Sequence, residues 1–431
     1  MKVLFITAGA AGMYCGSCFR DNALAAELKS RGHDVLLVPL YTPTLTDEPN
    51  VSEKRVFFGG ISVYLQQRAG FFRWTPRIFD KLLDAPWLIT AASSGSISTD
   101  PRSLGELTIS MLKGEDGFQR KEFDKMLEWL ASEPMPDVVQ LPNALLASLA
   151  PPIGRALKAP IYCTLQGEDL FLDGLAKPHR GEALGLIRKH AESVDRFTAV
   201  SAYYADFMAG YLGIPRGKID VVPLGINLDG FSRRDDAPAG RPFTVGFLAR
   251  IAPEKGLSEL CDAYVRFRKM AGVENARLEV AGYLARDQQK YLKDAERRLA
   301  GAGLAGEFHY RGALDRKQKI DFLRGLDVFS VPTVYVEPKG LFLLEAMACG
   351  VPVVQPRHGA FPEMLAKTSG GVLVEPGDTQ SLAEGLHELW KNPAQRVELG
   401  RNGFDGVREH YSISRSADRM LEVYERSTCS A

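Results

Sequence analysis

Two carboxylates stand eight positions apart in the stretch EPKGLFLLEAMACGVPVV, which begins at Glu337. Glu337 precedes a predicted apolar helix whose first backbone N–H groups belong to Gly340 and Leu341, and Glu345 lies inside that helix. Free N–H groups at a helix start bind anions, and a carboxylate accepts hydrogen bonds from sugar hydroxyl groups. Glu345 itself needs donors, because an unpaired carboxylate among apolar side chains is costly. Two vicinal ribose hydroxyls would supply them, and an Arg or Lys partner is the alternative interpretation.

Two cations stand five positions apart in a second stretch, FLARIAPEKGL, where Arg250 and Lys255 follow a predicted strand. Pro253, between them, is suited to the first turn of a helix. A forked guanidinium and an ammonium beside a helix start are suited to bind a diphosphate. The alternative is that both are solvated surface charges.

Both stretches lie in a series of alternating strands and helices that fills the second half of the chain, with predicted strands in FTVGFLA, RLEVAGY, EFHYRG, DVFSVPT, VPVVQP and GGVLVEP. The first half alternates in the same way, from KVLFITAG through PDVVQL, APIYCTLQG and DRFTAVS to KIDVVPLGI. This alternation predicts the α/β class with two doubly wound parallel sheets, which bind ligands where the strands' carboxyl ends meet helix starts. We expect an N-terminal Rossmann-like domain at 1–228, a polar linker at 229–242, a C-terminal Rossmann-like domain at 243–408 and a last helix at 409–431.

The composition is that of an ordinary globular protein of 431 residues, with 53 basic and 53 acidic side chains. This balance does not favour nucleic acid or an anionic membrane as a general partner. The opening MKVLFITAG has only a strand-length apolar run, so we expect neither a signal peptide nor a transmembrane segment, and a cytoplasmic protein. The six cysteines lack the spacing of a disulfide framework, and structural disulfides are not expected.

GFLARIAPEKGL and EPKGLFLLEAMACGVPVV together resemble the GT-B group of retaining, nucleotide-sugar-dependent glycosyltransferases, glycosyltransferase family 4 (glycosyl transferases group 1). DRFTAVSAYYADFMAGYLGIP and KIDVVPLGINLDGF fit the same family, so the resemblance spans most of the chain. It implies two Rossmann-like domains that face each other across a cleft, and a last helix that crosses back to the N-terminal domain.

By position, the resemblance implies that Arg250 and Lys255 bind the donor diphosphate and that Glu337 binds the hydroxyl groups of the transferred sugar. It implies further contacts to the donor, from the ribose and nucleobase to the phosphates and sugar, at Gly16, Leu314, Gly340, Leu341 and Glu345. Among these, Glu345 would bind the ribose, Leu314 would lie near the nucleobase and Gly16 would approach the phosphate. No metal site or cofactor is expected, because the two cations can take the place of a metal ion, and a UDP-sugar is slightly favoured as the donor substrate.

The N-terminal half departs from the family at two places. Family members often carry a His after the strand that here reads YCTLQGEDL, and this chain has Gln166 there. An amide cannot act as a general base, so we expect Gln166 to hold a sugar hydroxyl, with a loop-capping role as the alternative. Glu168 and Asp169 are candidate acceptor contacts, unless they form a solvated acidic turn. Cys15 replaces a usual glycine and has C-x2-C spacing to a second cysteine, which indicates small loop residues more than a redox pair.

These features predict transfer of a hexosyl group from a nucleoside-diphosphate sugar to a sugar, lipid or small-molecule acceptor, with retention of the anomeric configuration. Peripheral contact with a membrane stays open. The alternatives are a GT-B sugar-nucleotide epimerase, which would need acid and base side chains near the anomeric carbon, and a non-catalytic sugar-nucleotide-binding protein. Only a measurement of turnover distinguishes a glycosyltransferase from such a binding protein, because phosphate and ribose sites would be present in both.

Overall fold

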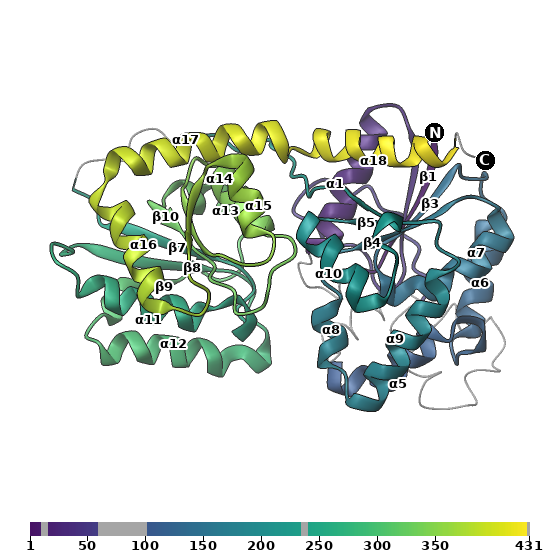
Figure 1. Cartoon of the computed structure of the whole chain (residues 1–431), viewed down its shortest axis with the longest axis horizontal. Helices are drawn as coiled ribbons and strands as arrows, with labels where there is room; N and C mark the ends of the chain where they lie inside the picture. Colours follow the sequence, from purple (N-terminus) through teal and green to yellow (C-terminus); the bar gives the residue numbers. More distant parts are fainter. Residues whose placement is uncertain (10–15, 59–100, 234–239, 429–431) are drawn as a thin grey trace. The chain divides into compact units, whose positions relative to one another are not determined.

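Parallel strands alternate with helices throughout the part of the chain that the computed structural model describes, residues 1–9, 16–58, 101–233 and 240–428 (Figure 1). The chain forms two units. Unit 1 comprises Met1–Pro223 and Ser416–Ala431, and unit 2 comprises Leu224–Arg415. Each unit has its own sheet and its own hydrophobic core.

The six-stranded sheet of unit 1 has the order β2-β1-β3-β4-β5-β6, and all its pairs are parallel. Its strands are short and almost continuously buried, as expected for a parallel sheet covered by helices on both faces. They are β1 (Lys2–Thr7), β2 (Asp34–Pro39), β3 (Val138–Leu141), β4 (Ile161–Leu165), β5 (Arg196–Ala199) and β6 (Ile219–Val221).

The helices of unit 1 connect these strands and end with the last helix of the chain. The α-helices are α1 (Gly16–Ser30), α5 (Pro101–Leu112), α6 (Arg120–Leu130), α7 (Ala150–Leu157), α8 (Asp169–Gly174), α9 (Lys177–Ala191), α10 (Ala202–Leu212) and α18 (Ile413–Thr428). Short 3-10 helices are η2 (Gly114–Asp116), η3 (Ala144–Leu149) and η4 (Arg216–Lys218).

The six-stranded sheet of unit 2 has the order β12-β11-β10-β7-β8-β9, again parallel throughout. Its strands are β7 (Phe243–Leu248), β8 (Ala276–Ala281), β9 (Phe308–Tyr310), β10 (Val328–Phe329), β11 (Val353–Pro356) and β12 (Gly371–Val374). The helices are η5 (Pro253–Lys255), α11 (Leu257–Arg268), η6 (Arg286–Gln288), α12 (Gln289–Gly301), η7 (Ala305–Glu307), α13 (Arg316–Arg324), α14 (Leu341–Ala348), α15 (Phe361–Thr368), α16 (Thr379–Lys391) and α17 (Pro393–His410). The predicted α/β architecture with two doubly wound parallel sheets is confirmed.

Helix α18 packs onto unit 1, where it lies beside α1 (Figure 1). Asp418 of α18 pairs with Arg31 at 2.6 Å, just after the end of α1. Deeper in the unit, the rings of Tyr424 and Tyr162 meet edge to face with centroids 4.9 Å apart. Helix α18 therefore reaches the sheet through buried side chains, and not only through surface contacts.

Pro253 lies in the first turn of a helical segment, as its position predicted. It begins the 3-10 helix η5, and the α-helix α11 follows from Leu257. Gly256 separates the two with φ of 76°, and a Cβ on it would lie 1.9 Å from the carbonyl oxygen of Pro332. The positive φ and this crowding require glycine at the junction of η5 and α11.

The described cysteines fit the expectation of free thiols. Cys18, Cys163, Cys261 and Cys349 are buried and form no disulfide. Among the described helices, none is long and apolar enough to cross a membrane. Over the same residues, no group of three or more His, Cys, Asp or Glu side chains is arranged to hold a metal ion.

Candidate active site

Lys255 and Glu337 form an ion pair at the carboxyl edge of the unit 2 sheet. The Nζ of Lys255 donates to Oε2 of Glu337 at 2.6 Å, from the loop after β7 to the loop before α14. Burial raises the pKa of the Glu337 carboxyl, but the charge and hydrogen bond of Lys255, with smaller effects of Lys339 and the Gly340 N–H, outweigh burial and lower this pKa. The two stretches singled out in the sequence thus meet directly, although 82 positions separate these two residues.

Arg250 does not join this ion pair. Its guanidinium pairs with Glu254, four residues on, and stays partly open to solvent. The expected diphosphate contact by Arg250 therefore requires it to exchange or share this partner when ligand binds. The contact remains a prediction.

The start of α14 has the geometry of an anion site. Gly340 precedes the helix with φ of 66°, and a Cβ there would lie 2.9 Å from the sulfur of Met364. Its N–H makes only a long contact of 3.4 Å with Oε1 of Glu337. The N–H of Leu341 donates to no atom among the described residues. The N–H of Leu341 is therefore open to a ligand, and that of Gly340 has only a weak contact to give up. Binding of a donor by either group remains a prediction.

Glu345 has a partner that the sequence left unidentified. Lys319, on the buried face of α13, donates from Nζ to Oε1 of Glu345 at 2.6 Å. The carboxylate is 9% exposed, and within the described parts of the chain Oε2 makes no hydrogen bond. The structure thus shows the ion pair that was the alternative interpretation. A contact of the second oxygen with a ribose remains a prediction.

Sequence reasoning missed Lys319, although the helix DRKQKIDFLRGL carried a signal. Lys319 lies next to Ile320 and four positions before Leu323, on the stripe of this helix that is buried. A lysine on an apolar stripe needs an acidic partner, because burying an unpaired ammonium is costly. The carboxylate in the following helix was the available candidate.

Two further residues predicted to contact the donor, Leu314 and Gly16, lie next to the starts of other helices. Leu314 is partly buried just before α13, whose start is capped by Asp315. Gly16 is the first residue of α1. Cys15 lies outside the described residues, so the C-x2-C pair has no structural account here, and Cys18 is buried in α1. The roles of Leu314 and Gly16 remain predictions.

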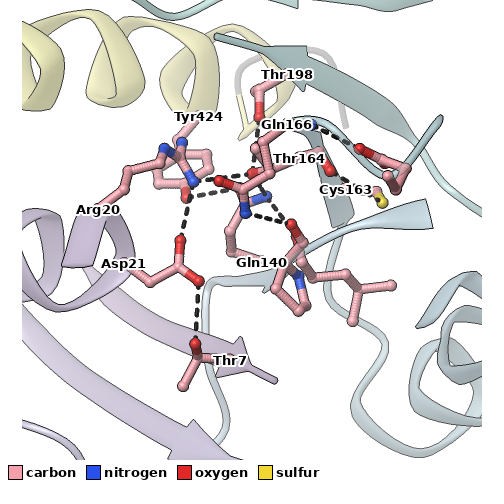
Figure 2. Close-up of polar contacts among 12 residues, drawn as sticks. Thr7, Arg20, Asp21, Gln140, Cys163, Thr164, Gln166, Thr198 and Tyr424 are labelled. Carbon is pink, nitrogen blue, oxygen red and sulfur yellow. Dashed lines mark hydrogen bonds and ion pairs between the residues drawn. The ribbon is translucent and has the colours of Figure 1, made fainter. Parts of the chain in front are cut away.

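Gln166 stands at the carboxyl end of β4 in unit 1, and its amide is half satisfied (Figure 2). Nε2 donates to the carbonyl oxygen of Pro142 at 2.7 Å, which is the loop-holding role named as the alternative. Oε1 is buried and has no hydrogen-bond partner. Because buried polar atoms normally have partners, this oxygen is a candidate acceptor for a ligand hydroxyl.

Glu168 and Asp169 do not form a solvated acidic turn, since each is 5% exposed. The hydroxyl of Tyr204 lies 2.7 Å from Oδ1 of Asp169 and 3.2 Å from Oε2 of Glu168. The oxygens of Glu168 also accept from the N–H groups of Ala144 at 3.0 Å and Gln166 at 2.7 Å. Burial raises the pKa of Glu168, and these N–H groups only partly offset it. Direct contact of either carboxylate with an acceptor remains a prediction.

A buried polar layer between the sheet of unit 1 and its helices was not foreseen (Figure 2). Arg20 of α1, 2% exposed, donates from Nη1 to Asp21 at 3.0 Å and to Thr164 at 3.2 Å. Gln140 donates to the same threonine and accepts from the hydroxyl of Tyr424 at 2.9 Å. This layer ties α1, β3, β4 and α18 together.

The fold defines the class of protein. The structure matches sucrose-phosphate synthase from Thermosynechococcus elongatus with a TM-score of 0.73, over 100% of both chains at 18% identity. It matches HepE from Anabaena, solved in complex with UDP, with a TM-score of 0.68, over 99% of this chain and 100% of that chain at 17% identity. These likenesses establish a GT-B fold.

The family follows from the sequence comparisons. The family model described as Glycosyl transferases group 1 matches residues 230–405, and the model described as Glycosyltransferase Family 4 matches residues 111–229. This chain belongs to the family 4 type of GT-B glycosyltransferases, as the motifs predicted.

Two relatives illustrate the family. The phosphatidyl-myo-inositol mannosyltransferase of Mycobacterium leprae is 33% identical over 208 residues, which are 47% of this chain and 52% of the relative. A GDP-mannose-dependent alpha-(1-6)-phosphatidylinositol monomannoside mannosyltransferase of Mycolicibacterium smegmatis is 26% identical over 295 residues, or 65% of this chain and 74% of the relative. The match to the first of these, and a match to an MMP alpha-(1->4)-mannosyltransferase of Mycolicibacterium hassiacum, span only 52% and 53% of those relatives.

Proposed function

We propose that this protein transfers a hexosyl group from a nucleoside-diphosphate sugar to an acceptor, with retention of the anomeric configuration. The observation that carries the proposal is the Lys255–Glu337 pair at the start of α14. It combines a cation, a carboxylate and backbone N–H groups within one short segment. Binding of a glycosyl donor uses all three: the cation and the N–H groups for the diphosphate that leaves, and the carboxylate for the sugar hydroxyls.

Departure of the nucleoside diphosphate leaves negative charge on a phosphate oxygen. The ammonium of Lys255 and the N–H groups at the start of α14 stabilise that charge, and Arg250 contributes when ligand draws it from Glu254. Such preorganised charge and dipoles are the main source of catalysis in reactions of this kind. Glu337 then has an oxygen available for the sugar hydroxyls.

The other predicted contacts complete the binding of substrate. Glu345 accepts from the ribose with Oε2, while its Oε1 stays on Lys319. Gln166 accepts a hydrogen bond from a hydroxyl of a sugar substrate through its unpartnered Oε1. The names of relatives include GDP-mannose as donor, whereas the sequence slightly favoured UDP, so both nucleotides belong in the test.

A thermal-shift screen of the whole chain against GDP-mannose, UDP-glucose and further nucleotide sugars tests donor binding, because a ligand that binds only the folded state raises the Tm. Release of the nucleoside diphosphate is then measured with and without mono- and disaccharide, inositol-lipid and aminocyclitol acceptors. Transfer predicts release that an acceptor accelerates and a product with the donor's anomeric configuration by NMR. Tight binding of a donor without release under any condition would contradict the proposal.

A further inference from the structure

The carboxylate of Glu168 holds two loops of unit 1 at the same time. Its Oε1 accepts from the N–H of Ala144, which opens η3 after β3, and its Oε2 accepts from the N–H of Gln166, just after β4. The two N–H groups lie in the loops that follow the neighbouring strands β3 and β4, 22 positions apart in the chain. Few side chains other than a carboxylate accept two such bonds in opposite directions.

These contacts leave Gln166 with little freedom. Its backbone N–H is fixed to Glu168 at 2.7 Å, and its Nε2 is fixed to the carbonyl oxygen of Pro142 at 2.7 Å. Pro142 and Ala144 belong to the same loop, so Gln166 is held to this loop directly through Nε2 and indirectly, by way of Glu168, through its backbone N–H. The one polar atom of the side chain without a partner is Oε1.

We propose that Glu168 is a positioning residue, which in its ionised form clamps the Pro142–Ala144 loop to Gln166 and so aims Oε1 of Gln166 at a sugar hydroxyl. This inference rests on the proposed function of the protein. It gives Glu168 a different role from the direct acceptor contact that the sequence predicted. Glu168 acts only through Gln166.

The clamp depends on the charge of Glu168. A protonated carboxyl turns one accepting oxygen into a donor, which then faces a backbone N–H and breaks one of the two anchors. The neighbouring groups that titrate are Asp169, Tyr204 and the buried thiol of Cys163, and burial with the nearby Asp169 charge raises the pKa of Glu168. A raised folded-state pKa means that the clamp opens at a higher pH than for an ordinary carboxyl.

The test compares the wild type with Glu168→Gln, Gln166→Ala and the double variant, by release of GDP from GDP-mannose and of UDP from UDP-glucose. Glu168→Gln keeps the shape but presents an NH2 group to one of the two backbone donors. We expect each single variant to lower kcat by about two- to tenfold, the scale of one neutral hydrogen bond. The double variant should be no slower than Gln166→Ala, because coupled residues give non-additive losses.

The pH profile separates positioning from general stability. The wild-type rate should fall on the acidic side as Glu168 protonates, and this limb should be absent from both single variants. Glu122→Gln, a buried carboxylate on α6, is the matched control and should keep both the rate and the limb. If Glu168→Gln does not fold, Glu168→Asp keeps the charge but shortens the reach, and it should show the same loss of rate.

The outcomes are distinguishable. A wild type that releases no nucleoside diphosphate overturns the proposed function and this role with it. The positioning role alone is overturned if Gln166→Ala is slow while Glu168→Gln or Glu168→Asp keeps the wild-type rate and pH profile. Additive losses in the double variant would also overturn it, because Glu168 would then act independently of Gln166.

Discussion

Glu345 offers the sharpest test of the proposed donor site, because its two carboxylate oxygens are expected to bind different groups. One oxygen is paired with Lys319 at 2.6 Å, and the other is open to the ribose. Glu345→Gln replaces the carboxylate with an amide of the same shape that can still accept from the lysine. Lys319→Met is the matched control, since it removes the ion pair and keeps the carboxylate.

The magnitudes follow from the two contacts. A hydrogen bond to a charged acceptor contributes about 1.5 to 3 kcal/mol, so the wild type should bind a ribonucleoside diphosphate about ten- to a hundredfold or more tighter than its 2′-deoxy form. Glu345→Gln should lose most of this preference. Lys319→Met should keep the preference but lose stability, by about 3 to 5 kcal/mol, because it leaves a buried carboxylate unpaired.

Isothermal titration calorimetry with GDP and dGDP, and with UDP and dUDP, measures the preference for each protein, and thermal unfolding measures the cost of breaking the pair. The effects of removing the 2′-hydroxyl and of changing Glu345 should be non-additive, as for any two groups in contact. If Glu345→Gln keeps the full ribose preference, or if the wild type has none, Glu345 serves only to neutralise Lys319 and the ribose assignment is wrong.

Three further predictions concern the start of α14 and its cations. Arg250→Ala and Lys255→Ala should each lower turnover about ten- to a hundredfold in the nucleoside-diphosphate release assay, while Arg266→Ala, an exposed control on α11, should change it less than twofold. Gly340→Ala should lower the free energy of unfolding by about 1 to 2 kcal/mol for the positive φ alone, plus the cost of a Cβ 2.9 Å from a methionine sulfur. An unchanged unfolding transition would contradict this backbone geometry. Because the pKa of Glu337 is lowered in the folded state, its ion pair stabilises the protein fully at pH values above the ordinary carboxyl pKa of 4.5, and this stability is lost as the pH falls through the folded-state pKa. Glu337→Gln should therefore make the free energy of unfolding less dependent on pH on the acid side. Parallel pH profiles of the variant and the wild type would refute this.

Local chemistry in the sequence was enough to predict both sheets and the start of α14. Every strand named from its apolar run is present, because a short β-branched run between turn signals is buried in a parallel sheet whatever its neighbours are. The start of α14 was equally readable, since Gly340 and the apolar helix after it determine their own backbone geometry. The need for glycine at position 256 was not readable in the same way, because it comes from the distant backbone of Pro332.

Only the tertiary structure decided how the charges are paired. The sequence could state that Glu345 needs a donor, but the choice of Lys319 depends on two helices packing side by side. The two hydrogen bonds of Glu168 likewise link the loops that follow two different strands. Arg20 donates to Thr164, which lies 144 positions away in the chain. Periodicity records which face of an element is buried, whereas the partner of a buried polar atom is set by geometry between elements, within hydrogen-bond distance.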